Sequence, residues 1–247
     1  MKATLRLLLL RRLILYLHHN YKNYTNYNYD YTNYNSNNDN YNAGALQSNQ
    51  INGENIFVSV MEYSAGDDLD SHLRKFRMMR EVDARIVFMQ IVSCLRHLAE
   101  QKEPIIHYDL KPANILFHSA LSTCMDIKIT DFGLSKIIAE GAAGDDNKID
   151  MTSPGAGTYW YLPPESFSES TTSKISPKVD IWSAGVIFYQ MLYGKRPFAD
   201  GESQRKIWQE QLIVRNANRL EFPEKPVVSE GAKSLIRRCL TPCEDDR

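Results

Sequence analysis

The sequence has few cysteines for its length, four in 247 residues, at Cys94, Cys124, Cys239 and Cys243. A small secreted domain that depends on disulfides carries a denser and more regular set, so these thiols argue against that class and favour a reducing compartment inside the cell. Cys239 and Cys243 lie close together, but Pro242 separates them and no second pair of ligands is near. We therefore expect ordinary thiols there rather than a zinc site.

Long apolar runs and a strong net charge are also absent. Near the N-terminus, the apolar run at residues 7–10 is interrupted by Arg11 and Arg12, far short of the roughly 20 residues that a membrane span needs. No small-residue cleavage site follows, so residues 1–19 are either a basic amphipathic helix, such as one that targets mitochondria, or an incidental N-terminus. The formal net charge of -1 gives no electrostatic reason to expect binding to nucleic acid or an anionic membrane.

Residues 20–54 are dominated by asparagine and tyrosine and show no apolar periodicity of 2 or 3.6. Such a tract cannot bury enough apolar surface to offset its ordering entropy, so we expect residues 1–54 to form a disordered region that is prone to self-association. The chain is 43% hydrophobic, enough for a packed core. We therefore expect one domain over residues 55–247.

Two short motifs contain the groups that phosphoryl transfer requires. The run IIHYDLKPANILF contains His107, Asp109, Lys111 and Asn114, and the strand-like IKI precedes Asp131 of DFG. Enzymes catalyse this reaction mainly by positioning the reactants and neutralising charge on the phosphate. Asp109 can orient the acceptor hydroxyl and Lys111 can neutralise the phosphate. Asn114 and Asp131 offer the oxygen ligands that Mg²⁺ prefers. Each motif alone could be a simple turn, but their spacing between strands favours catalysis.

At these residues the chain resembles the protein kinases, whose signature joins H-R-D-x-x-x-x-N to D-F-G and a later A-P-E. The match continues through GAGTYWYLPPE at residues 155–165 and DIWSAG at residues 180–185. The runs IIHYDLKPANIL, ITDFGLSK, GAGTYWYLPPE, FYQMLYGKRPF and LIRRCL are similar to the Tousled-like kinases, a family of nuclear serine/threonine kinases. The resemblance implies an α+β, protein-kinase-like fold, mainly its helical C-terminal lobe.

The resemblance also implies ATP and Mg²⁺ as cofactors. It makes Asp109 and Lys111 catalytic, and Asn114 and Asp131 metal ligands. The residues that it places around the nucleotide are Met61, Glu62, Ser64, Asp68 and Leu116. Residues 56–63 alternate like a half-buried strand, and the resemblance makes them the last strand of the small lobe and the hinge. Without the resemblance, an edge strand followed by an acidic helix cap explains them equally well.

Two positions bear on regulation and specificity. Tyr108 stands where most kinases have an arginine, which normally binds a phosphate on the activation segment, here expected at residues 134–157. Tousled-like kinases share this tyrosine, so we expect no switching of that kind, although Thr152 and Ser153 could be phosphorylated. Thr158 together with Lys111 is the pattern that goes with serine or threonine acceptors.

The remaining expectations concern structure. Apolar spacing predicts helices over residues 81–101, 179–193, 203–215 and 229–241. Val87, Ile91, Leu95 and Leu98 form the inner stripe of the first, Gly194 ends the second, and Leu235, Ile236 and Leu240 form the inner face of the last. Asp180 is placed to accept backbone hydrogen bonds from the catalytic loop, and Glu165 to pair with Arg247.

Upstream of Asn55 the sequence shows no glycine-rich loop and no strand lysine of the V-A-I-K type, since its only lysines are Lys2 and Lys22. We expect a kinase domain lacking most of its small lobe, through a truncated sequence or a natural inactive form, with feeble or no phosphate transfer. The leading hypothesis is ATP-dependent phosphorylation of protein serine and threonine. The alternative is an inactive, pseudokinase-like binding module; residues 157–165 and 180–185 argue against a small-molecule acceptor.

Partners and location follow from the resemblance alone. It implies a protein substrate, a histone chaperone among the candidates, and residence in the nucleus. The coiled-coil dimerisation region of that family is not in this sequence, so dimerisation cannot be inferred. We expect no direct contact with nucleic acid or membrane.

Overall fold

The computed structural model describes residues 46–51, 54–59, 63–119, 125–138, 148–150, 156–168 and 174–247. These residues divide into two compact units. One contains strands β1 and β2 together with Tyr63 and Thr130–Gly133, and the other contains the described residues of Ser64–Ile129 and Leu134–Arg247. Among the helices of these ranges, none has both the length and the apolarity to cross a membrane.

The first unit contains an antiparallel pair of strands, β1 (Leu46–Ile51) and β2 (Glu54–Ser59), in which Leu46 faces Ser59 and Ile51 faces Glu54. The sequence between them is Asn-Gly, a strong hairpin signal. We predicted a single strand over residues 56–63 and no structure before residue 55, so β1 lies within the predicted disordered tract and corrects that part of the prediction. The rest of the tract lies outside the described residues, and the domain division stays a prediction.

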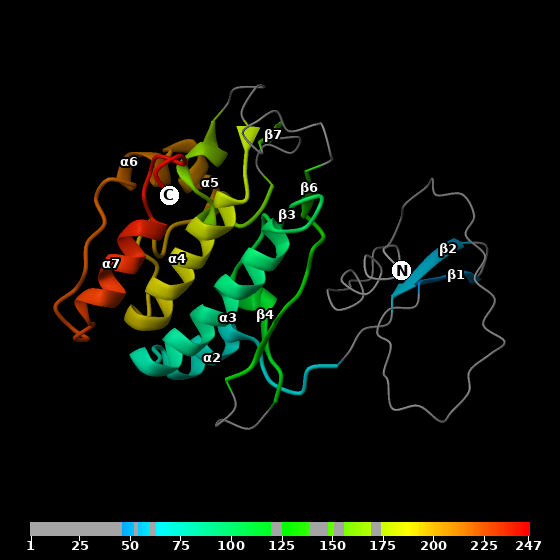
Figure 1. Cartoon of the computed structure of the whole chain (residues 1–247), viewed down its shortest axis with the longest axis horizontal. Coiled ribbons are helices and arrows are strands. Elements are labelled where there is room, and N and C mark those ends of the chain that lie inside the picture. Colours follow the sequence, from blue (N-terminus) through cyan, green and yellow to red (C-terminus); the bar gives the residue numbers. More distant parts are fainter. Residues whose placement is uncertain are drawn as a thin grey trace. The chain divides into compact units, whose positions relative to one another are not determined.

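The second unit is mostly helical, and its central element is α4 (Lys178–Tyr193). Figure 1 shows α4 between α3 (Glu81–Ala99) and α7 (Glu230–Cys239). Nearly every residue of α4 is buried, as its uniformly apolar sequence predicted. The helix ends at Gly194, whose φ of 67° suits glycine and whose N–H donates to the Gln190 carbonyl.

Helix α3 packs on α4 with the predicted stripe, in which Val87, Ile91, Leu95 and Leu98 are all buried. Next to this stripe, the ring of Phe88 stacks on Phe188 of α4 with centroids 4.4 Å apart. Fully burying an apolar side chain of this size stabilises a fold by roughly 1.5–3 kcal/mol. The stripe and this aromatic pair therefore fix α3 directly upstream of the catalytic loop.

Helix α7 packs on the other side of α4 through Ala232, Ile236 and Cys239, which recur at helical spacing. Ile236 and Leu240 are buried as predicted, but Leu235 is 37% exposed, so its assignment to the inner face was wrong. Adjacent helical residues point about 100° apart, and Leu235 falls outside the arc that faces α4.

The predicted helix over residues 203–215 is two helices, α5 (Gln204–Gln209) and α6 (Leu212–Asn216). The prediction of one helix was wrong because Gln211 between them has a φ of 52°, in the left-handed region that an α-helix cannot contain. Ser203 caps α5 by accepting a hydrogen bond from the Lys206 N–H at 3.2 Å.

Three short antiparallel strand pairs support the loops of the second unit. They join β3 (Ile105–Ile106) to β6 (Lys136–Ile137), β4 (Ile115–Phe117) to β5 (Ile127–Ile129), and β7 (Ile149–Asp150) to β8 (Lys174–Ile175). The remaining elements are α2 (Leu69–Phe76) and the 3₁₀ turns η1 (Pro112–Asn114), η2 (Tyr159–Tyr161) and η3 (Pro164–Phe167). The catalytic motif runs from β3 through η1 into β4.

Candidate active site

Asp180 of α4 holds the backbone of the catalytic loop. One carboxylate oxygen accepts the His107 N–H at 2.7 Å and the other accepts the Tyr108 N–H at 2.9 Å. Burial raises the pKa of the Asp180 carboxyl, and the charge of His107 and these two donors partly offset that effect. The predicted structural role of Asp180 is confirmed: its carboxylate accepts hydrogen bonds from two backbone N–H groups of the catalytic loop.

A second polar group of the site consists of Asp109, Lys111 and Thr158. The Lys111 ammonium lies 2.5 Å from Asp109 Oδ2, and the Thr158 hydroxyl donates to Asp109 Oδ1 at 2.7 Å. Lys111 also donates to the Thr158 hydroxyl at 3.2 Å. Asp109 is 8% exposed, so its carboxylate is held by specific partners rather than by bulk water.

Asn114 lies against the same carboxylate. Its amide nitrogen donates to the Asp109 carbonyl at 2.9 Å and approaches Asp109 Oδ2 at 3.5 Å. The side chain is buried, and because its nitrogen is the donor, its amide oxygen is the atom left to bind a cation. The structure thus brings together three of the predicted residues, Asp109, Lys111 and Asn114.

Tyr108 takes the place of the expected arginine and is almost fully buried. The Lys136 ammonium lies 5.4 Å from the centroid of its ring, within cation–π range. Burial raises the pKa of Tyr108 and lowers that of Lys136. Tyr108 has a φ of 67°, a strained conformation that costs roughly 1–3 kcal/mol and is common at active sites.

Two of the predicted nucleotide contacts are adjacent to each other. Asp68 and Leu116 form an isolated antiparallel bridge, and the Phe117 N–H donates to the Asp67 carbonyl at 3.0 Å. The Asp68 carboxylate caps α2 by accepting the N–H and the hydroxyl of Ser71, both at 2.8 Å. Asp68 is therefore the acidic helix cap that the sequence suggested as one interpretation. Its contact with the ribose stays a prediction.

The other residues predicted to contact the cofactors are Ser64, Met61, Glu62 and Asp131. Ser64 begins the second unit, whereas Met61 and Glu62 lie outside the described residues. Asp131 belongs to the first unit, has a φ of 63°, and accepts the Gly133 N–H at 3.3 Å. Its partnership with Asn114 around Mg²⁺ stays a prediction.

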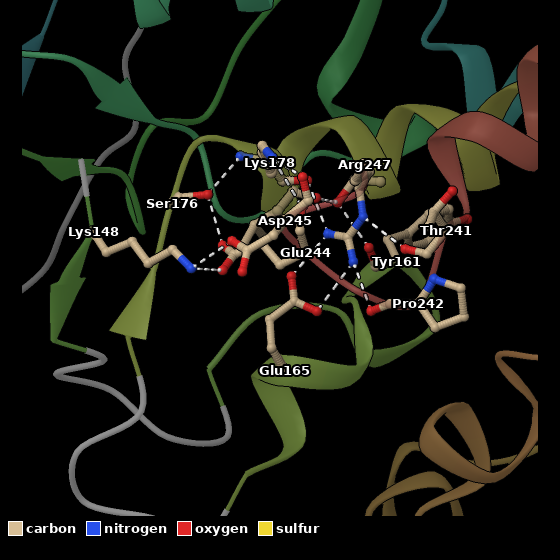
Figure 2. A network of polar contacts seen from close by, with 12 residues as sticks. Lys148, Tyr161, Glu165, Ser176, Lys178, Thr241, Pro242, Glu244, Asp245 and Arg247 are labelled. Carbon is tan, nitrogen blue, oxygen red and sulfur yellow. Dashed lines mark hydrogen bonds and ion pairs between the residues drawn. The ribbon is translucent and has the colours of Figure 1, made fainter. Parts of the chain in front are cut away.

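Figure 2 shows how residues 156–168, which are predicted to receive the substrate and are called the substrate-receiving segment below, are fixed to the C-terminal turn, residues 241–247. The guanidinium of Arg247 makes a bidentate ion pair with Glu165, with N–O distances of 2.8 and 3.2 Å. The same group donates to the carbonyls of Lys178, Thr241 and Pro242. The Arg247 side chain is fully buried, and the predicted pairing is confirmed.

The comparisons with known proteins agree with this geometry. The family model described as "Protein kinase domain" matches residues 43–247. The chain belongs to the protein kinase domain family. It is 54% identical to human serine/threonine-protein kinase tousled-like 1 over 192 residues, which are 77% of this chain and 25% of that protein.

Related sequences occur in distant organisms. The kinase domain is 53% identical to tousled-like 1 of Caenorhabditis elegans and 49% identical to TOUSLED of Arabidopsis thaliana, again over 77% of the chain. These matches cover 20% and 27% of the two relatives, so the chain spans about a quarter of the length of the curated relatives it matches. They confirm the predicted likeness to Tousled-like kinases and the protein-kinase-like fold.

The kinase domain also uses residues that sequence reasoning missed. Ser183 of α4 donates from its hydroxyl to the Tyr161 carbonyl at 2.7 Å and so fixes the end of η2. Lys148 pairs with Glu244 at 2.8 Å. No local pattern signals either contact, because in each case the partners are distant in sequence and meet only in the folded chain.

Three of the four cysteines lie in the part of the chain that the structure describes. Cys94, Cys239 and Cys243 are free, and burial raises the pKa of both Cys94 and Cys239 to about 11. Thiols with such a high pKa are mostly protonated near neutral pH and react slowly. Among the described residues, no three His, Cys, Asp or Glu side chains gather as a metal site.

Proposed function

We propose that this chain is part of a Tousled-like kinase and that it transfers the γ-phosphate of ATP to serine and threonine hydroxyls of proteins. The observation that supports this most is the group formed by Asp109, Lys111 and Thr158, in which both carboxylate oxygens of Asp109 are bound by side chains of the loop and of the substrate-receiving segment. The names of the relatives favour an active kinase over an inactive binding module.

The geometry suggests a role for each residue. Asp109 orients the acceptor hydroxyl and takes its proton, a contribution of typically 10²–10⁴ in rate for a general base. Lys111 holds Asp109 and carries the positive charge nearest to it, so it can also neutralise the transferred phosphate. Thr158 connects the base to the segment that receives the peptide, so base and acceptor are positioned together.

The residue types predicted to bind the cofactors fit ATP and Mg²⁺. The amide oxygen of Asn114 and the carboxylate of Asp131 are hard oxygen ligands of the kind Mg²⁺ takes beside phosphates and water. A bound Mg²⁺ neutralises charge on the phosphates. Asp68 and Leu116 are adjacent where the nucleotide is expected, and Met61, Glu62 and Ser64 would complete its contacts.

Substrate and location rest on the family. We propose a protein substrate with serine or threonine acceptors, a histone chaperone in particular, and residence in the nucleus. The names of the relatives support the acceptor type, since they are serine/threonine-protein kinases. The substrate and the nucleus are carried over from the resemblance alone.

The test is incubation of the purified chain with labelled ATP, Mg²⁺ and casein, followed by phosphoamino-acid analysis. We expect slow transfer to serine and threonine that stops when EDTA removes Mg²⁺. The rate should be below that of a kinase with a phosphate-binding lysine, because the only lysines upstream of Asn55 are Lys2 and Lys22. Label on tyrosine would contradict the proposal, and a folded chain that transfers nothing would favour the binding module.

A further inference from the structure

Lys148, which lies between the DFG motif and the substrate-receiving segment in the sequence, is attached to the C-terminal turn by an ion pair. The Lys148 ammonium lies 2.8 Å from Glu244 Oε2 and 3.0 Å from Asp245 Oδ1, as Figure 2 shows. Lys148 lies directly before β7, whose Ile149 is paired with Ile175 of β8. One strand pair and one charge cluster therefore hold the same short piece of chain.

Glu244 is itself held in place. Its other oxygen, Oε1, accepts the Ser176 hydroxyl at 2.6 Å, and its side chain is only 11% exposed. The Lys178 ammonium donates to the backbone carbonyls of Glu244 and Asp245, at 3.0 and 2.9 Å. The carboxylate that receives Lys148 is therefore pre-positioned, unlike an exposed partner that must be ordered first.

The electrostatics agree with this arrangement. Hydrogen bonds from Lys148 to Glu244 and Asp245 raise the pKa of Lys148, and the bond with Lys148 lowers the pKa of Asp245. Both shifts favour the charged forms of Lys148 and Asp245. The attachment needs no phosphate, which fits a catalytic loop with Tyr108 in place of the arginine that would bind one.

We propose that Lys148 is a positioning residue: its ion pair with Glu244 and Asp245 holds residues 148–150 of the activation segment so that residues 156–168 can receive a protein substrate. This ion pair thus takes the positioning role that a phosphorylated residue and its arginine partner have in most kinases. The geometry of the attachment stands independently, and its effect on catalysis rests on the proposed function.

Hydrogen exchange tests the attachment without requiring catalysis. In Lys148→Met, backbone amides at residues 149–150 should exchange roughly threefold to tenfold faster than in the wild type, because local opening becomes easier. Wild-type exchange there should also rise in high salt, while the variant should respond less. Lys148→Arg keeps the charge and should exchange nearly as the wild type does.

The matched control is Lys233→Met. Lys233 pairs with Glu230 at 2.8 Å and its side chain is 22% exposed, close to the 21% of Lys148. This variant should leave exchange at residues 149–150 unchanged. Equal exchange in Lys148→Met and the wild type would overturn the proposal, as would faster exchange spread evenly over the whole domain, which would show general destabilisation.

The catalytic readout is the steady-state kinetics of a serine peptide. If Lys148 positions the segment, Lys148→Met should raise the peptide KM severalfold and leave the KM for ATP within about twofold. An unchanged peptide KM with altered exchange would show that the attachment exists but does not position the substrate. Failure of the proposed function would instead appear as no transfer by the wild type, with the exchange result unaffected.

Discussion

At the scale of single residues, the site depends on charged side chains that are buried with complete sets of partners. Arg247 is the clearest case: its guanidinium meets a bidentate carboxylate and three backbone carbonyls. Removing a charged group from water is expensive, and such a group is tolerated only where its hydrogen bonds are replaced. The Arg247 and Glu165 pair therefore fixes the substrate-receiving segment strongly as long as both members are present.

Glu165→Gln tests this pair. The amide keeps the shape but loses the charge, which leaves the buried guanidinium uncompensated, so the free energy of unfolding should fall by about 3 kcal/mol. Denaturant titration followed by fluorescence measures the change. Glu100→Gln is the control, since Glu100 lies 3.9 Å from Arg96 with both side chains about 70% exposed (72% and 68%) and should change stability by less than about 0.5 kcal/mol. Equal stability of the two variants would contradict the account.

At the scale of elements, the helices of the second unit pack more closely than their sequences suggest. Gly185 of α4 faces α7 at a distance that leaves no room for a side chain: a Cβ there would lie 2.6 Å from Cys239 Cβ and 3.0 Å from Leu240 Cδ2. A glycine inside a helix normally costs stability. Here it permits the contact between α4 and α7 that supports the C-terminal turn.

Gly185→Ala should therefore destabilise the domain by roughly 1–3 kcal/mol, because overpacking forces α7 to shift. Gly231→Ala is the matched control: its nearest atom would be Ser229 Oγ at 3.8 Å, so the better helix propensity of alanine should leave stability unchanged or raise it by up to about 1 kcal/mol. Thermal unfolding compares the two. If Gly185→Ala were as stable as Gly231→Ala, the close packing of α4 on α7 would be wrong.

A second contact between elements gives a prediction about pH. Glu81, the first residue of α3, accepts the N–H and the hydroxyl of Ser229, the residue that caps α7. These hydrogen bonds lower the pKa of Glu81 in the folded state. The stabilisation is therefore complete above the ordinary glutamate pKa of about 4.3 and is lost as pH falls through the lower folded value.

Glu81→Gln should be less stable than the wild type at pH 7, and the difference should shrink steadily on acidification below about pH 4.3. Unfolding curves collected at several pH values measure it. A difference that stays constant down to pH 3 would mean that the Glu81 carboxylate contributes nothing through its charge.

Several elements were predictable because their signals are local. The buried stripe of α3 follows from periodicity, the burial of α4 from its uniformly apolar sequence, and the end of α4 from Gly194. The break at Gln211 was not predictable, because a left-handed glutamine has no sequence signal. Strand β1 was missed because its polar sequence, LQSNQI, shows no alternation and was read with the asparagine-rich tract.

At the scale of the whole molecule, the site is assembled from segments far apart in the sequence. Thr158 meets Asp109 across 49 residues, and Asp180 meets Tyr108 across 72. The residue types of the site could be recognised from the motifs and the resemblance, and their catalytic roles stay predictions. The contacts of Lys148 could not, since an ion pair across 97 residues depends on how the folded chain brings its two partners together.

The central claim is that Asp109 acts as the carboxylate that orients the acceptor hydroxyl. The most direct test is the initial rate of label transfer from ATP to casein by the wild type, Asp109→Asn and the control Asp83→Asn, whose carboxylate pairs with Arg80 on the surface. Matching unfolding midpoints would show that all three are folded. We predict a rate about 10²–10⁴ lower for Asp109→Asn and an unchanged rate for Asp83→Asn. A folded Asp109→Asn variant that transfers phosphate as fast as the wild type would contradict the account.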